Sequence, residues 1–206
     1  MYKIIFFILV SLAIVSIHAE EIPADQKIGS EIVLSIKKDA ISKKKFLIKI
    51  PPNFVAINSV AVEKEKFYEF IPEGESPYMW SEIITIMQIP SKSNSMIQLL
   101  KRLEAECKVK NEKCLHYLAE ENGVKVAFLT TDTLACFPNS NPGATTVKIP
   151  GKNELLVMKI IQELDGFAIV QISVKYDNKS SPETKEKIRE KMFDFVKSCE
   201  ICDNAV

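Results

Sequence analysis

The sequence contains few of the residues from which common catalytic and binding motifs are built. Only six glycines occur in 206 residues, and they do not form the glycine-rich loop that cradles a phosphate. The chain also lacks an HExxH zinc motif and a GxSxG nucleophile elbow. Arg102 and Arg189 are the only arginines among 27 basic residues, although arginine is the side chain that holds phosphates and carboxylates through two parallel hydrogen bonds. The familiar nucleotide-binding, zinc-protease and serine-hydrolase signatures are therefore absent, and the charge balance does not favour nucleic acid as a partner.

The N-terminal segment has the layout of a secretory signal peptide. Lys3 precedes an apolar run over residues 4–17, and Ala19 provides the small residue expected at a cleavage site. This run is too short for a membrane span, which needs about 20 residues, so we expect a cleaved signal peptide at 1–19. Residues 20–30 form a polar lead-in, and no second long apolar stretch follows. We predict a secreted or periplasmic protein with no stable membrane insertion after cleavage.

The remaining chain, residues 31–206, is predicted to form one domain rich in strands. Two hairpins are indicated where Asn122-Gly123 and Asp165-Gly166 each separate two apolar runs, because both pairs tolerate the positive φ angles of a type I′ turn. After the second turn, apolar residues alternate with Gln171, Ser173 and Lys175. This alternation predicts a sheet with one buried face and one face nearer to water. Further strands are expected at residues 31–37, 45–50, 67–71 and 81–89.

Two amphipathic helices are predicted from apolar residues at helical spacing. The first lies within residues 93–108, and the second begins after Ser181, a plausible N-cap, with Pro182 at its first position. The inward-facing residues are Met96, Leu99, Leu100, Leu103 and Cys107 in the first helix, and Ile188, Met192, Phe195, Val196 and Cys199 in the second. We therefore predict an α+β fold, an antiparallel sheet with two amphipathic helices packed on it.

Three stretches carry a resemblance to a known group of folds. They are "FYEFIPEGESPYMWSEIITI" (67–86), "LACFPNSNPGATTV" (134–147) and the final "KSCEICD" (197–203). With the order of elements, they make residues 45–202 resemble the PsbP-like and DcrB-like fold of small exported accessory proteins, and similar stretches occur in secreted proteins of proteobacteria. The resemblance implies a non-enzymatic module that binds something, and it assigns no catalytic residue and no cofactor.

Five cysteines lie in the predicted mature chain: Cys107, Cys114, Cys136, Cys199 and Cys202. Cysteines of exported proteins usually form disulfides, and five of them allow two bridges with one thiol left over, or one bridge with three thiols. Bridges that tie helix ends to the sheet are favoured, for example Cys107 to Cys136. The sequence does not determine the pairing.

The C-terminal CxxC, Cys199 and Cys202, has three interpretations: a redox catalyst, half of a metal site, or a structural pair. Redox CxxC motifs place the reactive thiol at a helix N-terminus, whereas this pair follows the end of a helix and lies among Glu200 and Asp203, which disfavours a thiolate. A zinc site needs a second pair of ligands, and His116 is the only histidine of the predicted mature chain. We expect a structural role in which at least one of the two cysteines ties down the last helix.

Two other places are candidates for function. His116 lies in a predicted strand and is interpreted as a surface or boundary residue. Tyr78, Met79 and Trp80 follow a turn and form a possible contact surface, because aromatic residues and methionine are common at protein interfaces; for Trp80, packing in the core is the favoured alternative.

We therefore predict a secreted or periplasmic binding or accessory module, stabilised by disulfides, that acts on an unknown protein partner. One alternative is an exported hydrolase whose site the sequence does not reveal. A less favoured alternative is a thiol oxidoreductase that uses the C-terminal CxxC. No metal or other cofactor is expected.

Overall fold

The computed structural model of the chain describes residues 31–40, 42–62, 65–91, 95–110, 112–137 and 147–203. The predicted signal peptide and the polar lead-in both lie outside these residues. Within strands and helices, the side chains of residues 60–62, 109–110, 136–137 and 147–148 also lie outside the described part.

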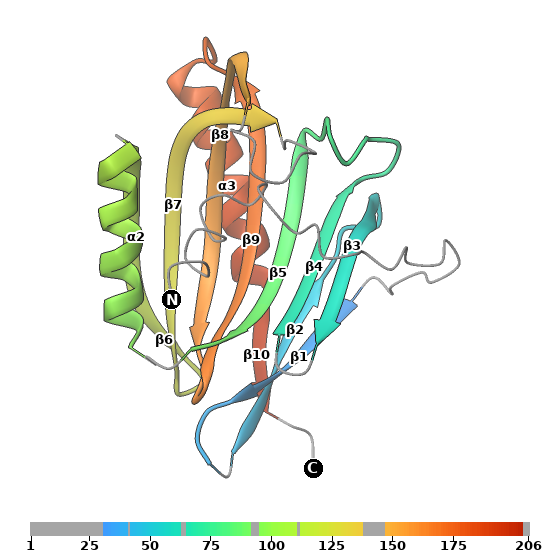
Figure 1. Cartoon of the computed structure of the whole chain (residues 1–206). Helices are drawn as coiled ribbons and strands as arrows, with labels where there is room; N and C mark the ends of the chain where they lie inside the picture. The colour runs from blue at the N-terminus through green and yellow to red at the C-terminus, as the bar shows by residue number, and fades with distance from the viewer. Residues whose placement is uncertain are drawn as a thin grey trace.

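Strands dominate the described residues and form two antiparallel sheets, accompanied by two helices. The larger sheet has the strand order β3-β4-β5-β9-β8-β7-β6, and the smaller has the order β1-β2-β10. This α+β architecture confirms the predicted fold class (Figure 1). The elements are β1 (Glu31–Lys37), β2 (Lys43–Lys49), β3 (Phe54–Val62), β4 (Glu65–Pro72), β5 (Glu82–Pro90), α2 (Met96–Lys110), β6 (Lys113–Glu121), β7 (Val124–Phe137), β8 (Val147–Gln162), β9 (Gly166–Asp177), α3 (Pro182–Ser198) and β10 (Glu200–Asp203). Neither helix of the described chain is long and apolar enough to cross a bilayer.

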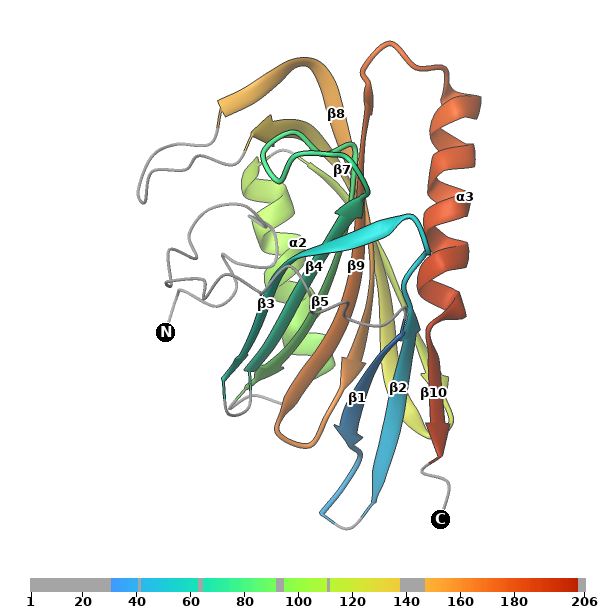
Figure 2. The same cartoon turned by 90° about the vertical axis from the view of Figure 1, so that its right-hand side faces the viewer.

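The two helices lie on opposite faces of the large sheet (Figure 2). On one face, α3 and the small sheet cover a core that includes Phe46, Val170 and Val196. On the other face, α2 covers a second apolar cluster with Leu103 and Met158 near its centre. The small sheet was not predicted, because β10 has only four residues and pairs with β2, far away in the sequence.

The central strand β9 corrects one prediction about the sheet. Its apolar residues face the α3 side as expected, but Gln171 and Ser173 on the other face are also buried. The prediction that this face of the sheet lies nearer to water is therefore wrong for these two residues. The reason is position in the sheet: β9 pairs with β5 and β8, and Phe167 and Ile169 on the same face belong to the cluster under α2.

The two predicted hairpins form, but their turns differ. Asn122 and Gly123 both have positive φ angles, 50° and 70°, as the type I′ prediction requires. In the second hairpin, β8 ends at Gln162 and β9 begins at Gly166, and Gly166 does not have a positive φ angle, so the two-residue turn predicted there is wrong. Glycine is needed at this position for space, because a Cβ atom would lie only 2.0 Å from the carbonyl oxygen of Ile89 on β5.

Helix α3 begins as predicted, and its C-terminal end contacts a buried lysine of β8. At its start, the Ser181 side chain accepts a hydrogen bond from the Thr184 backbone N–H, and Pro182 follows the cap. At its end, Nζ of Lys159 donates to the carbonyl oxygen of Cys199 at 2.7 Å. The same Nζ lies 2.6 Å from a carboxylate oxygen of Glu121 on β6.

Lys159 is almost fully buried, so its charge depends on these partners. Its Nζ lies 5.8 Å from the ring centre of Phe46 and 5.6 Å from that of Phe128, between the small sheet and the large one. A cation near the faces of two aromatic rings gains further electrostatic stabilisation. The lysine therefore connects β8, the end of β6 and the end of α3.

We expect Lys159→Met to lower the free energy of unfolding by about 3 kcal/mol, because it leaves the Cys199 carbonyl and the Glu121 carboxylate without their partner. Urea unfolding followed by circular dichroism measures this loss. The matched control is Lys191→Met, which removes an exposed ion pair with Glu82 and should cost less than about 1 kcal/mol. Equal effects of the two substitutions would contradict the assigned role of Lys159.

Candidate functional site

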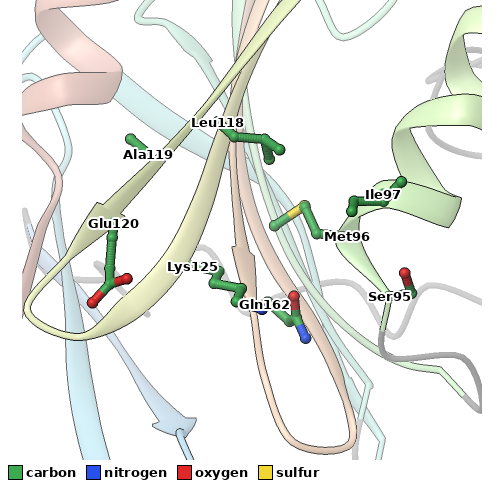
Figure 3. A pocket seen from close by; sticks show the side chains of 8 residues that line it. All are labelled: Ser95, Met96, Ile97, Leu118, Ala119, Glu120, Lys125 and Gln162. Carbon is green, nitrogen blue, oxygen red and sulfur yellow. The ribbon is translucent and has the colours of Figure 1, made fainter.

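A pocket of about 680 Å³ lies between the start of α2 and the β6–β7 hairpin (Figure 3). Its volume falls within the range of about 300–1,000 Å³ that is usual for ligand sites. Figure 3 shows Leu118 of β6 projecting toward Met96 and Ile97 of α2. The lining residues are Ser95, Met96, Ile97, Leu118, Ala119, Glu120, Lys125 and Gln162.

The local sequence explains why this pocket has an apolar wall and a polar side. Met96 begins the inward-facing stripe of α2 and is buried, whereas Ile97 is one position further around the helix and is 57% exposed. Leu118 of β6 is 52% exposed. The charged residues Glu120 and Lys125 lie opposite each other in the β6–β7 register, so one balances the charge of the other.

The pocket adjoins an edge of the large sheet. β6 is the last strand in the sheet order, so within the described residues no further strand pairs with its outer side. Leu115 and Tyr117 on this strand are exposed, and the Tyr117 ring stacks on Phe128 with 4.9 Å between ring centres. An exposed edge strand with several apolar side chains is a template for pairing with another chain.

A second, smaller pocket of about 200 Å³ lies beneath the β1–β2 hairpin and contains lysines and acids. Its acids already have partners within the fold. Nζ of Lys37 lies 3.5 Å from Asp165, and the Glu163 carboxylate accepts hydrogen bonds from Gln88 at 2.9 and 3.1 Å. Because its acids already have partners within the fold and its volume is less than a third of the other, the pocket beside β6 is the stronger candidate.

The three residues of the predicted contact surface after β4 differ in their exposure to solvent. Tyr78 and Met79 are exposed, and their role as a contact surface stays a prediction. Trp80 is buried with Ile71 and Ile83, in agreement with the favoured interpretation that it packs in the core. Nζ of Lys175 lies 3.4 Å from the centre of the Trp80 ring, so this tryptophan covers a cation on β9.

His116 lies on the α2 side of β6 rather than in the pocket. Its Nδ1 is 3.2 Å from a carboxylate oxygen of Glu104 on α2. The histidine therefore meets an acid, as a hydrolase would require. Cys114, two residues earlier on the strand, is a poor nucleophile, because burial, Cys107, Glu104 and Glu112 together raise the pKa of its thiol.

No disulfide joins Cys107, Cys114, Cys199 and Cys202, the four cysteines whose side chains the structure describes. The side chain of Cys136 lies outside the described part, so the suggested Cys107–Cys136 bridge stays a prediction. At the C-terminal CxxC, burial raises the pKa of the Cys199 thiol to about 12, and the charge of nearby Lys159 opposes this shift only in part. In the structure, the end of α3 is held in place without a disulfide. The Lys159 hydrogen bond to the Cys199 carbonyl and the pairing of β10 with β2 hold it.

A row of polar side chains crosses four neighbouring strands on the α2 side of the large sheet. Asn58, Glu69, Thr85 and Gln171 lie opposite one another in the register from β3 to β9. Nδ2 of Asn58 donates to Glu69 at 3.4 Å, and the buried hydroxyl of Thr85 has no hydrogen-bond partner among the described residues. Burial raises the pKa of Glu69 to about 7, and the Asn58 hydrogen bond opposes this shift.

Sequence reasoning did not identify this row or the lining of the pocket. Gln171 was recognised only as a polar position in an alternating strand, and Glu69 lies in a run where no alternation distinguishes it. Ile97 and Leu118 look like ordinary apolar residues in their segments. Their grouping depends on how strands and helices pair, which no local pattern specifies.

Two comparisons with known proteins give no relative for this chain. Neither the protein-family models nor the curated proteins contain a match. Among the described residues, no group of three or more histidine, cysteine, aspartate or glutamate side chains is placed to hold a metal ion. The candidate site therefore depends on its geometry alone.

We expect the stability of the protein to fall as the pH rises from about 4.5 to about 7, in part because of Glu69. The folded chain keeps the proton of this carboxyl up to about pH 7, while the unfolded chain releases it near pH 4.5, so the folded state binds more protons in this interval. Glu69→Gln removes this contribution. The free energy of unfolding of the variant should therefore fall less than that of the wild type as the pH rises from about 4.5 to about 7. Urea unfolding at several pH values in this interval measures the difference.

Glu65→Gln is the matched control for this experiment, because Glu65 is an exposed carboxylate at the start of the same strand. It should leave the pH dependence unchanged. If Glu69→Gln also follows the wild-type curve in parallel, the protonated state assigned to Glu69 is wrong.

Proposed function

We propose that this chain is a secreted or periplasmic binding module that acts through protein contacts and holds an extended segment of a partner protein along the outer edge of β6. The observation that carries the proposal is the combination of an open pocket with an edge strand whose outer side no other described strand pairs with. In this mode of recognition, main-chain hydrogen bonds to the edge supply affinity, and pockets for alternate side chains supply specificity.

The surroundings of β6 define the chemistry of the segment. Successive side chains of an added strand point to opposite faces of the sheet. One set would enter the pocket against Ile97 and Leu118, and the other would lie beside Leu115 and Tyr117 on the opposite face. The segment should therefore be apolar on both faces, uncharged at its centre and free of proline, because proline cannot donate a backbone hydrogen bond to the edge.

The proposed compartment is supported by the sequence of the first 19 residues. The lysine, the apolar run and the small residue at position 19 favour export with cleavage of the signal. The resemblance to PsbP-like and DcrB-like accessory proteins points to the same class of function and stays a prediction.

The two enzymatic alternatives receive less support from the site. For the hydrolase, His116 is paired with Glu104, but Cys114 beside it has a raised pKa. For the thiol oxidoreductase, Cys199 is fully buried and its pKa is raised to about 12, whereas a reactive thiol needs access and a lowered pKa.

The proposal is tested by selecting, on the purified chain, from a displayed library of random peptides long enough to pair with all of β6. Selected peptides should be extended and apolar, and their binding is measured by fluorescence anisotropy. Leu118→Asp should weaken binding at least about tenfold, equivalent to about 1.4 kcal/mol, because it places a charge in the apolar wall of the pocket. Methylation of a peptide backbone nitrogen that faces β6 should also weaken binding.

Val33→Asp is the matched control, because Val33 has a similar exposure on β1, in the other sheet. It should leave the peptide affinity unchanged. The proposal is wrong if the selection yields no peptide, or if the selected peptides bind the Leu118→Asp protein as tightly as the wild type.

A further inference from the structure

Two cysteines meet where α2 turns back into β6. Cys107 is the last inward-facing residue of α2 described and is buried, and Cys114 is the second residue of β6 and packs against the cluster beneath the helix. The thiol of Cys114 is hydrogen-bonded to Cys107. The two thiols therefore lie near each other, although no disulfide joins them and no pair of described cysteines lies at disulfide distance.

The surrounding contacts keep the helix and the strand in this register. The backbone N–H of Glu112 donates to the Cys107 carbonyl oxygen at 2.9 Å, so the connection folds back directly onto the end of the helix. One turn earlier in α2, Glu104 pairs with His116, two residues further along β6. These contacts on either side of the two cysteines bring the same faces of α2 and β6 together.

We propose that Cys107 and Cys114, rather than Cys107 and Cys136, form a disulfide that locks α2 onto β6. The bond would close one end of the helix–strand pair, whose other end carries Met96, Ile97 and Leu118 around the pocket. It would thereby limit how far the two walls of that pocket can separate. The inference concerns the covalent structure of the chain and holds whether or not β6 binds a peptide.

The bond forms by thiol–disulfide exchange with a small-molecule or protein disulfide, such as oxidised glutathione. The thiolate of Cys114, the more exposed of the two, attacks one sulfur of the oxidant, breaks its S–S bond and releases one reduced thiol. The thiolate of Cys107 then attacks the Cys114 sulfur of the mixed disulfide and releases the second thiol. The protein loses two protons and two electrons, and the oxidant is reduced to two thiols.

The environment of Cys114 affects the rate of this exchange. Burial, the adjacent Cys107 and the carboxylates of Glu104 and Glu112 all raise the pKa of the Cys114 thiol. Only the thiolate attacks a disulfide, so uncatalysed oxidation should accelerate about tenfold for each unit of pH in the neutral to mildly alkaline range. A protein disulfide donor in an oxidising compartment would overcome this slow step.

The test is peptide mapping of the full chain after exposure to oxidised glutathione at mildly alkaline pH. Trypsin separates the cysteines, since it releases "LEAECK" (103–108) with Cys107 and "CLHYLAEENGVK" (114–125) with Cys114. The expected result is one species in which these two peptides are joined, two hydrogen atoms lighter than their sum and separated by reduction. The proposal is overturned if both cysteines are still alkylated as free thiols after this exposure. It is also overturned if either one is linked to the peptide that contains Cys136.

Hydrogen exchange provides a second, independent measurement. Reduction of the oxidised protein, or the Cys107→Ser/Cys114→Ser double variant, should make the amides of α2 exchange at least about tenfold faster, because the helix loses its covalent link to the sheet. Cys202→Ser is the matched control, a partly exposed cysteine outside this pair, and should leave the exchange of α2 unchanged. If the double variant does not fold, the peptide map of the wild-type chain still decides the question.

Discussion

The ammonium group of Lys159 is the contact on which the packing of the layers depends. It lies in the apolar core between the two sheets and reaches Glu121 at the end of β6 and the Cys199 carbonyl at the end of α3. A buried charge is tolerated only in the geometry that satisfies it, so this lysine selects one position of α3 over others that would bury the same apolar area. Asn122 reinforces that position by donating a hydrogen bond to the carbonyl oxygen of Ile201.

Features encoded within a few neighbouring residues were predictable from the sequence. The Asn122-Gly123 turn, the Ser181-Pro182 start of α3 and the inward stripe of α2 each follow from local conformational preference or from periodicity. Together they were enough to predict an α+β fold, an antiparallel sheet with two amphipathic helices packed on it. The interpretation of Trp80 as a core residue followed from its position at the start of a strand and from its large apolar side chain.

Features that depend on pairing between distant segments were not predictable. The small sheet joins residues near both ends of the described chain, and the polar row arises only once the registers of β3, β4, β5 and β9 are aligned. Gly166 is a second example of a feature that the local sequence does not predict. Its neighbours in the sequence indicate a tight turn, but glycine is required there because β9 approaches the backbone of β5 closely. The candidate site is of this second kind, since its walls come from four separate elements.

The pairing of β10 with β2 also imposes an order of events during biosynthesis. The three-stranded layer includes residues 43–49 and residues 200–203, so it stays incomplete until the final strand has left the ribosome. Structures dominated by contacts between distant segments fold slowly, because loop closure must precede the contacts that reward it. Hairpins between neighbouring strands of the large sheet, such as β6–β7, carry no such constraint, because their two strands are joined by a short turn.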